Sequence, residues 1–185
     1  MSDMTRQYNI AVVGATGAVG EAMLSLLAER GFPAAQVAAL ASPRSVGTEV
    51  AYGDHTLRVE DLSAFDFAST DIALFSAGGA ISAEHAPRAA AAGAVVIDNT
   101  SHFRNDPDVP LIVPEVNAHA IGGYTQRGII ANPNCSTIQM VVALKPLADA
   151  AGLERINVAT YQAVSGTGKD AIEELAQQTA SLMNG

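Results

Sequence analysis

The only cysteine of this 185-residue chain, Cys135, stands in a segment whose composition suits nucleophilic chemistry, NPNCST at 132–137. The thiolate is the nucleophilic form of cysteine, and a helix N-terminus stabilises its negative charge through free backbone N–H groups. Residues 129–131 read as the end of a short strand, and Ser136 or Thr137 as the start of an apolar helix. The pattern therefore predicts an activated cysteine at a helix start, although a lone cysteine is equally typical of a small buried hydrophobic residue.

A glycine-rich segment near the N-terminus has the spacing and the flanks of a dinucleotide-binding turn. Residues 10–13 are an apolar run typical of a buried strand, GATGAVG follows at 14–20, and a helix is expected at 21–30. Glycine allows the tight turn and lets a pyrophosphate approach the backbone, while the helix N-terminus supplies donors and positive potential. Gly17 stands one residue later than in the common GxGxxG motif. The alternative is a strand-to-helix turn with a structural role alone.

The segment after the second expected strand, at 36–40, indicates which nucleotide binds. NAD-binding folds usually place a carboxylate there, which accepts a hydrogen bond from the ribose 2′-hydroxyl. This chain has no carboxylate at that place but Arg44, flanked by Ser42 and Ser45. A guanidinium and two hydroxyls suit a 2′-phosphate. We therefore predict NADP rather than NAD, and an ordinary solvated loop arginine is the alternative.

The next segments alternate strands and helices. Residues 56–59 resemble a peripheral strand, 71–76 and 94–98 resemble core strands, and 82–92 form an alanine-rich helix. This order indicates an α/β fold with a Rossmann-like, doubly wound parallel sheet. The carboxyl ends of the strands face the ligand crevice in such a sheet, so residues 76–79 are expected beside the cofactor.

The last part of the chain reads as the start of a second, α+β domain with catalytic and dimerisation roles. A strand is expected at 156–164, a tight turn at 165–168 and an amphipathic helix at 170–182. We predict two domains, with the nucleotide-binding domain over 1–134 and the second over 135–185. Gln162, late in the expected strand, could orient an acyl group or simply satisfy backbone groups.

The loop at 99–117 is polar and rich in proline, and such long loops after core strands tend to carry function. Arg104 is a planar cation that could grip a substrate phosphate or carboxylate. A salt bridge from Arg104 to Asp106 or Asp108 is the alternative. The histidines at 85, 102 and 119 share no spacing typical of a metal site, so we predict no bound metal.

Composition excludes several classes of function. The net charge of −9 argues against binding the phosphate backbone of nucleic acids. One cysteine excludes an intramolecular disulfide framework and a cysteine-based zinc cluster, and no apolar run reaches the ~20 residues of a membrane span. Residues 1–8 lack the apolar core of a signal peptide. We expect a soluble, acidic, cytoplasmic protein with no nucleic-acid or membrane partner.

Six motifs, in order across nearly the whole chain, resemble those of the aspartate-β-semialdehyde dehydrogenases. They are GATGAVG at 14–20, SAGG at 76–79, DNTS at 98–101 followed by Phe103 and Arg104, VPEVN at 113–117, NPNCST at 132–137 and QAVSG at 162–166. The related N-acetyl-γ-glutamyl-phosphate reductases typically carry another residue, such as glycine, where Asn134 stands, and an aromatic residue in the glycine loop.

This resemblance implies NADPH-dependent reduction of β-aspartyl phosphate to the semialdehyde with release of phosphate, a step towards lysine through diaminopimelate, and towards threonine and methionine. It implies that Cys135 forms an acyl-thioester and that Gln162 contacts the substrate or the thioester. Arg104 and Asn134 are the other expected contacts of the substrate or its phosphate. The residues expected at the cofactor are Gly14, Thr16, Gly17, Ala18, Val19, Ser42, Arg44, Ser45, Ser76, Ala77, Gly78, Gly79, Ser165 and Gly166.

The chain departs from the family pattern in its length. Family members are considerably longer, and their second domain supplies a catalytic histidine downstream, whereas all four histidines of this chain precede Cys135. We therefore expect a fragment that binds NADP weakly and turns over little by itself, taken from an enzyme that is a homodimer at full length. The alternatives are a non-catalytic NADP-binding module and another phosphorylating dehydrogenase, of the N-acetyl-γ-glutamyl-phosphate reductase or glyceraldehyde-phosphate type.

Overall fold

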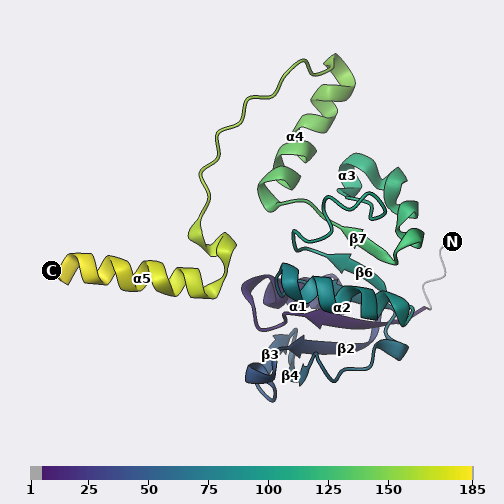
Figure 1. Cartoon of the computed structure of the whole chain (residues 1–185), viewed down its shortest axis with the longest axis vertical. Coiled ribbons are helices and arrows are strands. Elements are labelled where there is room, and N and C mark those ends of the chain that lie inside the picture. The colour runs from purple at the N-terminus through teal and green to yellow at the C-terminus, as the bar shows by residue number, and fades with distance from the viewer. Residues whose placement is uncertain (1–5, 185) are drawn as a thin grey trace. The chain divides into compact units, whose positions relative to one another are not determined.

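The computed structural model describes residues 6–184, which fall into two compact units divided between Gly152 and Leu153 (Figure 1). The first unit holds a seven-stranded sheet of order β3-β4-β2-β1-β5-β6-β7. The strands are β1 (Tyr8–Val13), β2 (Ala34–Ala41), β3 (Glu49–Tyr52), β4 (His55–Asp61), β5 (Ile72–Phe75), β6 (Val95–Asp98) and β7 (Ile129–Ala131). All neighbouring pairs are parallel except β3 and β4. The expected Rossmann-like α/β fold is confirmed.

Helices connect the strands and cover the sheet. The α-helices are α1 (Ala18–Glu29), α2 (Gly79–Ala91), α3 (Pro114–Asn117), α4 (Cys135–Ala151) and, in the second unit, α5 (Lys169–Asn184). Four 3₁₀ segments join them: η1 (Pro43–Ser45), η2 (Phe67–Ser69), η3 (Ala118–Gln126) and η4 (Val164–Thr167). Within the described residues, no helix has both the length and the apolar character that crossing a lipid bilayer requires.

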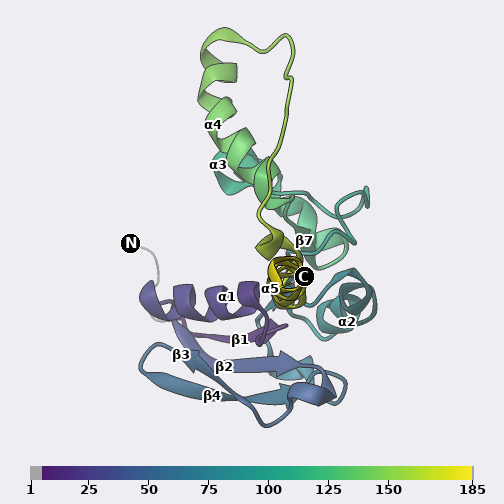
Figure 2. The same cartoon turned by 90° about the vertical axis from the view of Figure 1, so that its left-hand side faces the viewer.

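Strand β1 lies in the middle of the sheet and is buried on both faces. Ile10 and Val12 pack with Leu24 of α1, whereas Ala11 and Val13 point the other way and pack with α2 residues such as Ala86. Figure 2 shows α1 running along β1, with β2 and β4 beyond it. Successive side chains of a strand alternate between faces, so an unbroken apolar strand must be covered on both sides. Helices α1 and α2 supply these two covers.

The edge of the sheet differs from the sequence-based expectation. Residues 56–59 were expected to form a peripheral strand, but β4 is an inner strand that pairs with β2 on one side and β3 on the other. The two-residue turn Gly53-Asp54 joins β3 to β4, and Gly53 adopts a φ of +57°. Glycine reaches this left-handed conformation without strain, so the chain can reverse tightly and place β3 at the edge.

The second unit contradicts one expected element. The strand expected at 156–164 is absent: residues 156–163 are exposed and belong to no strand. A strand needs a neighbouring strand to pair its backbone N–H and C=O groups, and among the described residues no strand of the sheet runs beside this segment as a partner. The helix expected at 170–182 is confirmed as α5, which begins one residue earlier and ends two residues later.

Candidate active site

Two glycine turns meet where the strand order reverses, between β1 and β5. Gly14 follows β1 with a φ of +87°, and a Cβ added there would lie 2.8 Å from the carbonyl oxygen of Ser76, which follows β5. A side chain at residue 14 would therefore force the two turns apart. Sheets of this kind bind ligands at the carboxyl ends of the strands beside such a reversal. The structure brings the two predicted nucleotide-binding segments together at this place.

The first turn of α1 packs directly on the Gly14 turn. Gly17 is the N-cap of α1, and a Cβ added to Gly20 would lie only 2.1 Å from the Gly14 carbonyl oxygen. Sequence reasoning expected this helix at 21–30, yet it begins at Ala18, which brings Ala18 and Val19 into its first turn. Their N–H groups are among those that the helix itself cannot pair. This end of α1 therefore offers backbone donors and positive potential to an anion.

Helix α2 begins in a similar way at the neighbouring turn. Gly78 is its N-cap with a φ of +96°, and α2 starts at Gly79. Ser76 donates its backbone N–H to Val13, at the end of β1, which ties this turn to the first one. Ser76 and Ala77 thus lie against the Gly14 turn, and Gly78 and Gly79 follow them into α2. The expected contact of these residues with the cofactor stays a prediction.

The cation expected to choose between nucleotides lies just beyond β2. Arg44 belongs to η1, is exposed, and makes no ion pair with another described residue. Ser45 donates its backbone N–H to the Ser42 carbonyl oxygen, which closes the turn around Arg44. Arg58 of β4 adds a second cation: its Nη2 would lie 3.4 Å from a Cβ added to Gly47. Sequence reasoning missed Arg58 because the hairpin that brings β4 beside η1 was not recognised.

Cys135 is the first residue of the 17-residue helix α4 and is exposed. Asn134 is the N-cap, and its Oδ1 accepts hydrogen bonds from the Ser136 backbone N–H at 3.1 Å and hydroxyl at 2.6 Å. The Cys135 sulfur lies 3.7 Å from the same oxygen. The predicted setting is confirmed, although the helix starts at the cysteine itself rather than at Ser136 or Thr137. The alternative of a buried structural cysteine is wrong.

Arg104 is held by backbone groups that follow two neighbouring strands. Its Nε donates to the carbonyl oxygen of Asn132, after β7, and its Nη2 donates to that of Asn99, after β6, each at 3.0 Å. The alternative partner Asp106 pairs instead with Arg127, at 3.2 Å. Arg104 thus lies at the turn that leads to Cys135, with donors left for an anionic ligand.

A buried carboxyl group fixes the loop that carries Arg104. Asp98, the last residue of β6, is fully buried and accepts three hydrogen bonds: from the Ser82 hydroxyl at 2.9 Å, the Thr100 N–H at 2.9 Å and the Thr100 hydroxyl at 2.8 Å. A buried carboxylate is costly unless donors surround it. Asp98 therefore ties α2 to the loop after β6. Sequence reasoning quoted Asp98 as part of a motif but gave it no role.

Three predicted site residues lie in the second unit. Gln162 belongs to the exposed extended segment, and Ser165 and Gly166 belong to η4. The roles of these three residues stay predictions. Over residues 6–184, no three side chains of the metal-ligating types gather closely enough to hold an ion.

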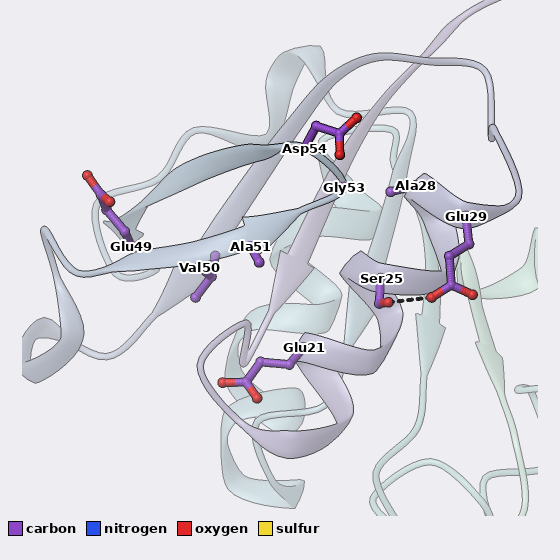
Figure 3. Close-up of a pocket in the computed structure, with 9 residues that line it drawn as sticks. All are labelled: Glu21, Ser25, Ala28, Glu29, Glu49, Val50, Ala51, Gly53 and Asp54. Atoms are coloured by element: carbon purple, nitrogen blue, oxygen red, sulfur yellow. Dashed lines mark hydrogen bonds between the residues drawn. The ribbon is translucent and has the colours of Figure 1, made fainter.

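A separate hollow between α1 and β3 is acidic (Figure 3). Four carboxylate side chains line it, and the Ser25 hydroxyl donates to one of them at 2.6 Å. The acidic residues are Glu21, Glu29, Glu49 and Asp54. Their charges repel phosphate groups, so this hollow does not suit a dinucleotide.

Comparisons with known proteins agree with this geometry. Residues 9–124 match the family described as semialdehyde dehydrogenase, NAD binding domain, and residues 144–185 match semialdehyde dehydrogenase, dimerisation domain. The chain is 62% identical to aspartate-semialdehyde dehydrogenase of Legionella pneumophila over 98% of its own length and 52% of that protein's. It therefore spans about half the length of the curated relatives it matches.

Solved structures show the same likeness. A crystal structure of Vibrio cholerae aspartate semialdehyde dehydrogenase II complexed with ASA is 60% identical, with a TM-score of 0.93 over 97% of this chain and 54% of that one. The Candida albicans enzyme with NADP is 26% identical, with a TM-score of 0.63 over 80% of this chain and 48% of that one.

Proposed function

We propose that this chain, which belongs to the semialdehyde dehydrogenase family, supplies the nucleotide site and the nucleophile for reduction of aspartyl 4-phosphate to aspartate 4-semialdehyde. One observation carries the proposal: Cys135 begins helix α4, and the turn that precedes it also holds Arg104. A nucleophile beside an anion-binding cation is the arrangement that an acyl phosphate requires. The high identity to aspartate-semialdehyde dehydrogenases supports aspartyl phosphate as the acyl donor.

The described residues fit a nicotinamide dinucleotide. Neither Gly14 nor Gly20 has room for a Cβ. The backbone of the first turn of α1 therefore packs directly on the backbone of the Gly14 turn. The N–H groups of Ala18 and Val19 in the first turn of α1, with the start of α2 at Gly79, suit a pyrophosphate. NADPH, when bound, supplies the hydride that reduces the acyl group. Arg44 would hold its 2′-phosphate, which favours NADP over NAD.

The chemistry of the chain's own residues begins at the sulfur of Cys135. The thiolate attacks the acyl carbon, a carbon–sulfur bond forms, and the carbon–oxygen bond to the phosphate breaks with the electron pair leaving on the phosphate. Cys135 presents its sulfur at the first residue of α4, the end of a helix at which an anion is favoured. Arg104 would neutralise the departing phosphate, and Asn134, next to the nucleophile, is the second expected substrate contact.

Other parts of the proposal rest on the family resemblance. Gln162 would contact the substrate or its thioester, and Ser165 and Gly166 would contact the cofactor. Homodimerisation is proposed for the full-length protein because residues 144–185 match the dimerisation domain of the family. The reaction would serve the synthesis of lysine, threonine and methionine. The cytoplasmic location, expected from the sequence, stays a prediction.

Acylation of the chain tests the proposed half-reaction. The chain is incubated with aspartyl 4-phosphate in the absence of NADPH, and intact-mass and peptide mass spectrometry then locate any acyl group. We expect one aspartyl group on Cys135 and none in Cys135→Ser. N-acetylglutamyl 5-phosphate serves as the competing donor, and faster acylation by it would replace aspartyl phosphate as the substrate. An unmodified Cys135 in the folded chain would contradict the proposal.

A further inference from the structure

A hydrogen bond between two asparagine side chains joins the ends of strands β6 and β7. Asn132 donates its side-chain N–H to the Asn99 side-chain oxygen at 2.6 Å. Both residues are partly buried, and each also uses its backbone N–H: Asn99 donates to the Phe75 carbonyl oxygen at 2.9 Å and Asn132 to that of Asp98 at 3.1 Å. The pair thus links neighbouring strand ends at the edge of the sheet where the site lies.

The same two residues supply both anchors of Arg104. The guanidinium donates from Nε to the Asn132 carbonyl oxygen and from Nη2 to the Asn99 carbonyl oxygen. A guanidinium is planar and its N–H donors point in fixed directions. Two hydrogen bonds from one side of the Arg104 guanidinium therefore fix the orientation of the guanidinium plane and the direction in which its remaining donors point. The distance between the two carbonyl oxygens therefore decides how Arg104 is aimed.

We propose that Asn99 and Asn132 are positioning residues that aim Arg104 at the anion bound beside Cys135. This inference rests on the proposed function. The Asn99–Asn132 bond holds the two carbonyl anchors at a fixed separation, and Asn132 also begins the three-residue turn, 132–134, that directly precedes the cysteine. The same backbone segment, 132–134, therefore fixes the positions of both the Arg104 guanidinium and Cys135. Asp98, the last residue of β6, holds the backbone at Asn99 through two hydrogen bonds from Thr100, the next residue.

The effect of Arg104 on Cys135 can be measured in the full chain by comparing the alkylation rates of a charged and a neutral reagent. Iodoacetate is an anion and iodoacetamide is neutral, and both alkylate the Cys135 thiolate. The ratio of their two rate constants reports the positive potential at the sulfur. Asn132 precedes Cys135 by three positions and its carbonyl oxygen lies 3.0 Å from the Arg104 Nε, so the guanidinium lies within roughly 14 Å of the cysteine backbone even for a fully extended turn. At that range, removal of the cation by Arg104→Ala should lower the ratio about two- to fivefold.

The asparagine variants are then compared in the same assay. Asn132→Ala keeps both carbonyl anchors but removes the donor of the side-chain bond, and Asn99→Ala removes its acceptor. We expect each to lower the ratio at least half as far as Arg104→Ala on a logarithmic scale. The double variant Arg104→Ala/Asn132→Ala should fall no further than Arg104→Ala alone, because both changes act through one cation.

A matched control separates positioning from general stability. Asn117→Ala also deletes an asparagine that bonds the backbone twice, at the Val113 N–H and the Leu111 carbonyl oxygen, but it does not touch Arg104. We expect it to leave the ratio unchanged. A merely structural role for Asn99 and Asn132 would change both alkylation rates in proportion and leave the ratio at the wild-type value. A wild-type ratio in the Asn99 and Asn132 variants, or an unchanged ratio in Arg104→Ala, would overturn the inference. Failure of the proposed function is a separate result, an unacylated Cys135 in the acylation experiment.

Discussion

Gly20→Ala tests whether the close contact between α1 and the Gly14 turn builds the nucleotide site. The added Cβ would lie 2.1 Å from the Gly14 carbonyl oxygen and 2.8 Å from the Ala15 Cα, and neither backbone atom can swing away. An ordinary contact begins at 3.4 Å, so the first turn of α1 must move outward. Overpacking of this kind costs about 1 to 3 kcal/mol. The better helix propensity of alanine returns about 1 kcal/mol.

We therefore expect Gly20→Ala to lower the free energy of unfolding by up to about 2 kcal/mol in a denaturant titration. The displaced helix N-terminus should also weaken NADPH binding about tenfold, or about 1.4 kcal/mol, in a fluorescence titration. Gly79→Ala is the matched control for stability: it also changes a glycine in the first turn of a helix, but its Cβ would meet its nearest neighbour at 3.8 Å. If Gly20→Ala were as stable as Gly79→Ala and bound NADPH like the wild type, the packing argument would be refuted.

Three further predictions concern other parts of the unit. Arg44→Ala should weaken NADPH binding about tenfold or more and leave NADH binding unchanged, since it removes a charged donor to the 2′-phosphate; equal losses for both nucleotides in parallel titrations would contradict this role. Ser82→Ala removes a donor from buried Asp98 and should cost about 1 to 3 kcal/mol of unfolding free energy in a denaturant titration; a loss under 0.5 kcal/mol, about that of a surface change, would contradict it. Burial first, and then the charge of Arg88, lowers the pKa of His85, so the unfolded chain takes up the proton first as pH falls. Unfolding free energy should therefore decline below about pH 6.5 until the pH passes the folded pKa, and His85→Gln should remove that part of the decline; an unchanged pH profile in the variant would count against it.

Most of the first unit could be predicted from sequence because its signals are local. Apolar runs ending in glycine mark β1 and β5, and the order of strands and helices fixes a doubly wound sheet. The β3–β4 hairpin was missed, although Gly53-Asp54 is a recognised hairpin turn, because the flanking segments alternate weakly between apolar and polar residues. The strand expected at 156–164 has a convincing composition, but a strand depends on a partner, and composition cannot show whether one is present.

The site likewise has features that local sequence predicts and features that depend on contacts between distant residues. Cys135 and its cap can be predicted because a turn, a capping residue and an apolar helix follow one another directly in the sequence. The anchors of Arg104 could not be predicted, since Asn132 lies 28 residues away and the contact depends on β6 and β7 being neighbours. The role of Asp98 was missed for the same reason: its hydroxyl partner, Ser82, comes from the preceding helix.

Release of phosphate in a single turnover tests the central claim, that Cys135 of this chain displaces phosphate from an acyl phosphate. The chain is mixed with excess aspartyl 4-phosphate without NADPH, and a phosphate sensor follows the first seconds. The account predicts a burst of one phosphate per chain above spontaneous hydrolysis, and no burst in Cys135→Ser. The absence of a burst in the folded wild-type chain, or an equal burst in Cys135→Ser, would contradict it.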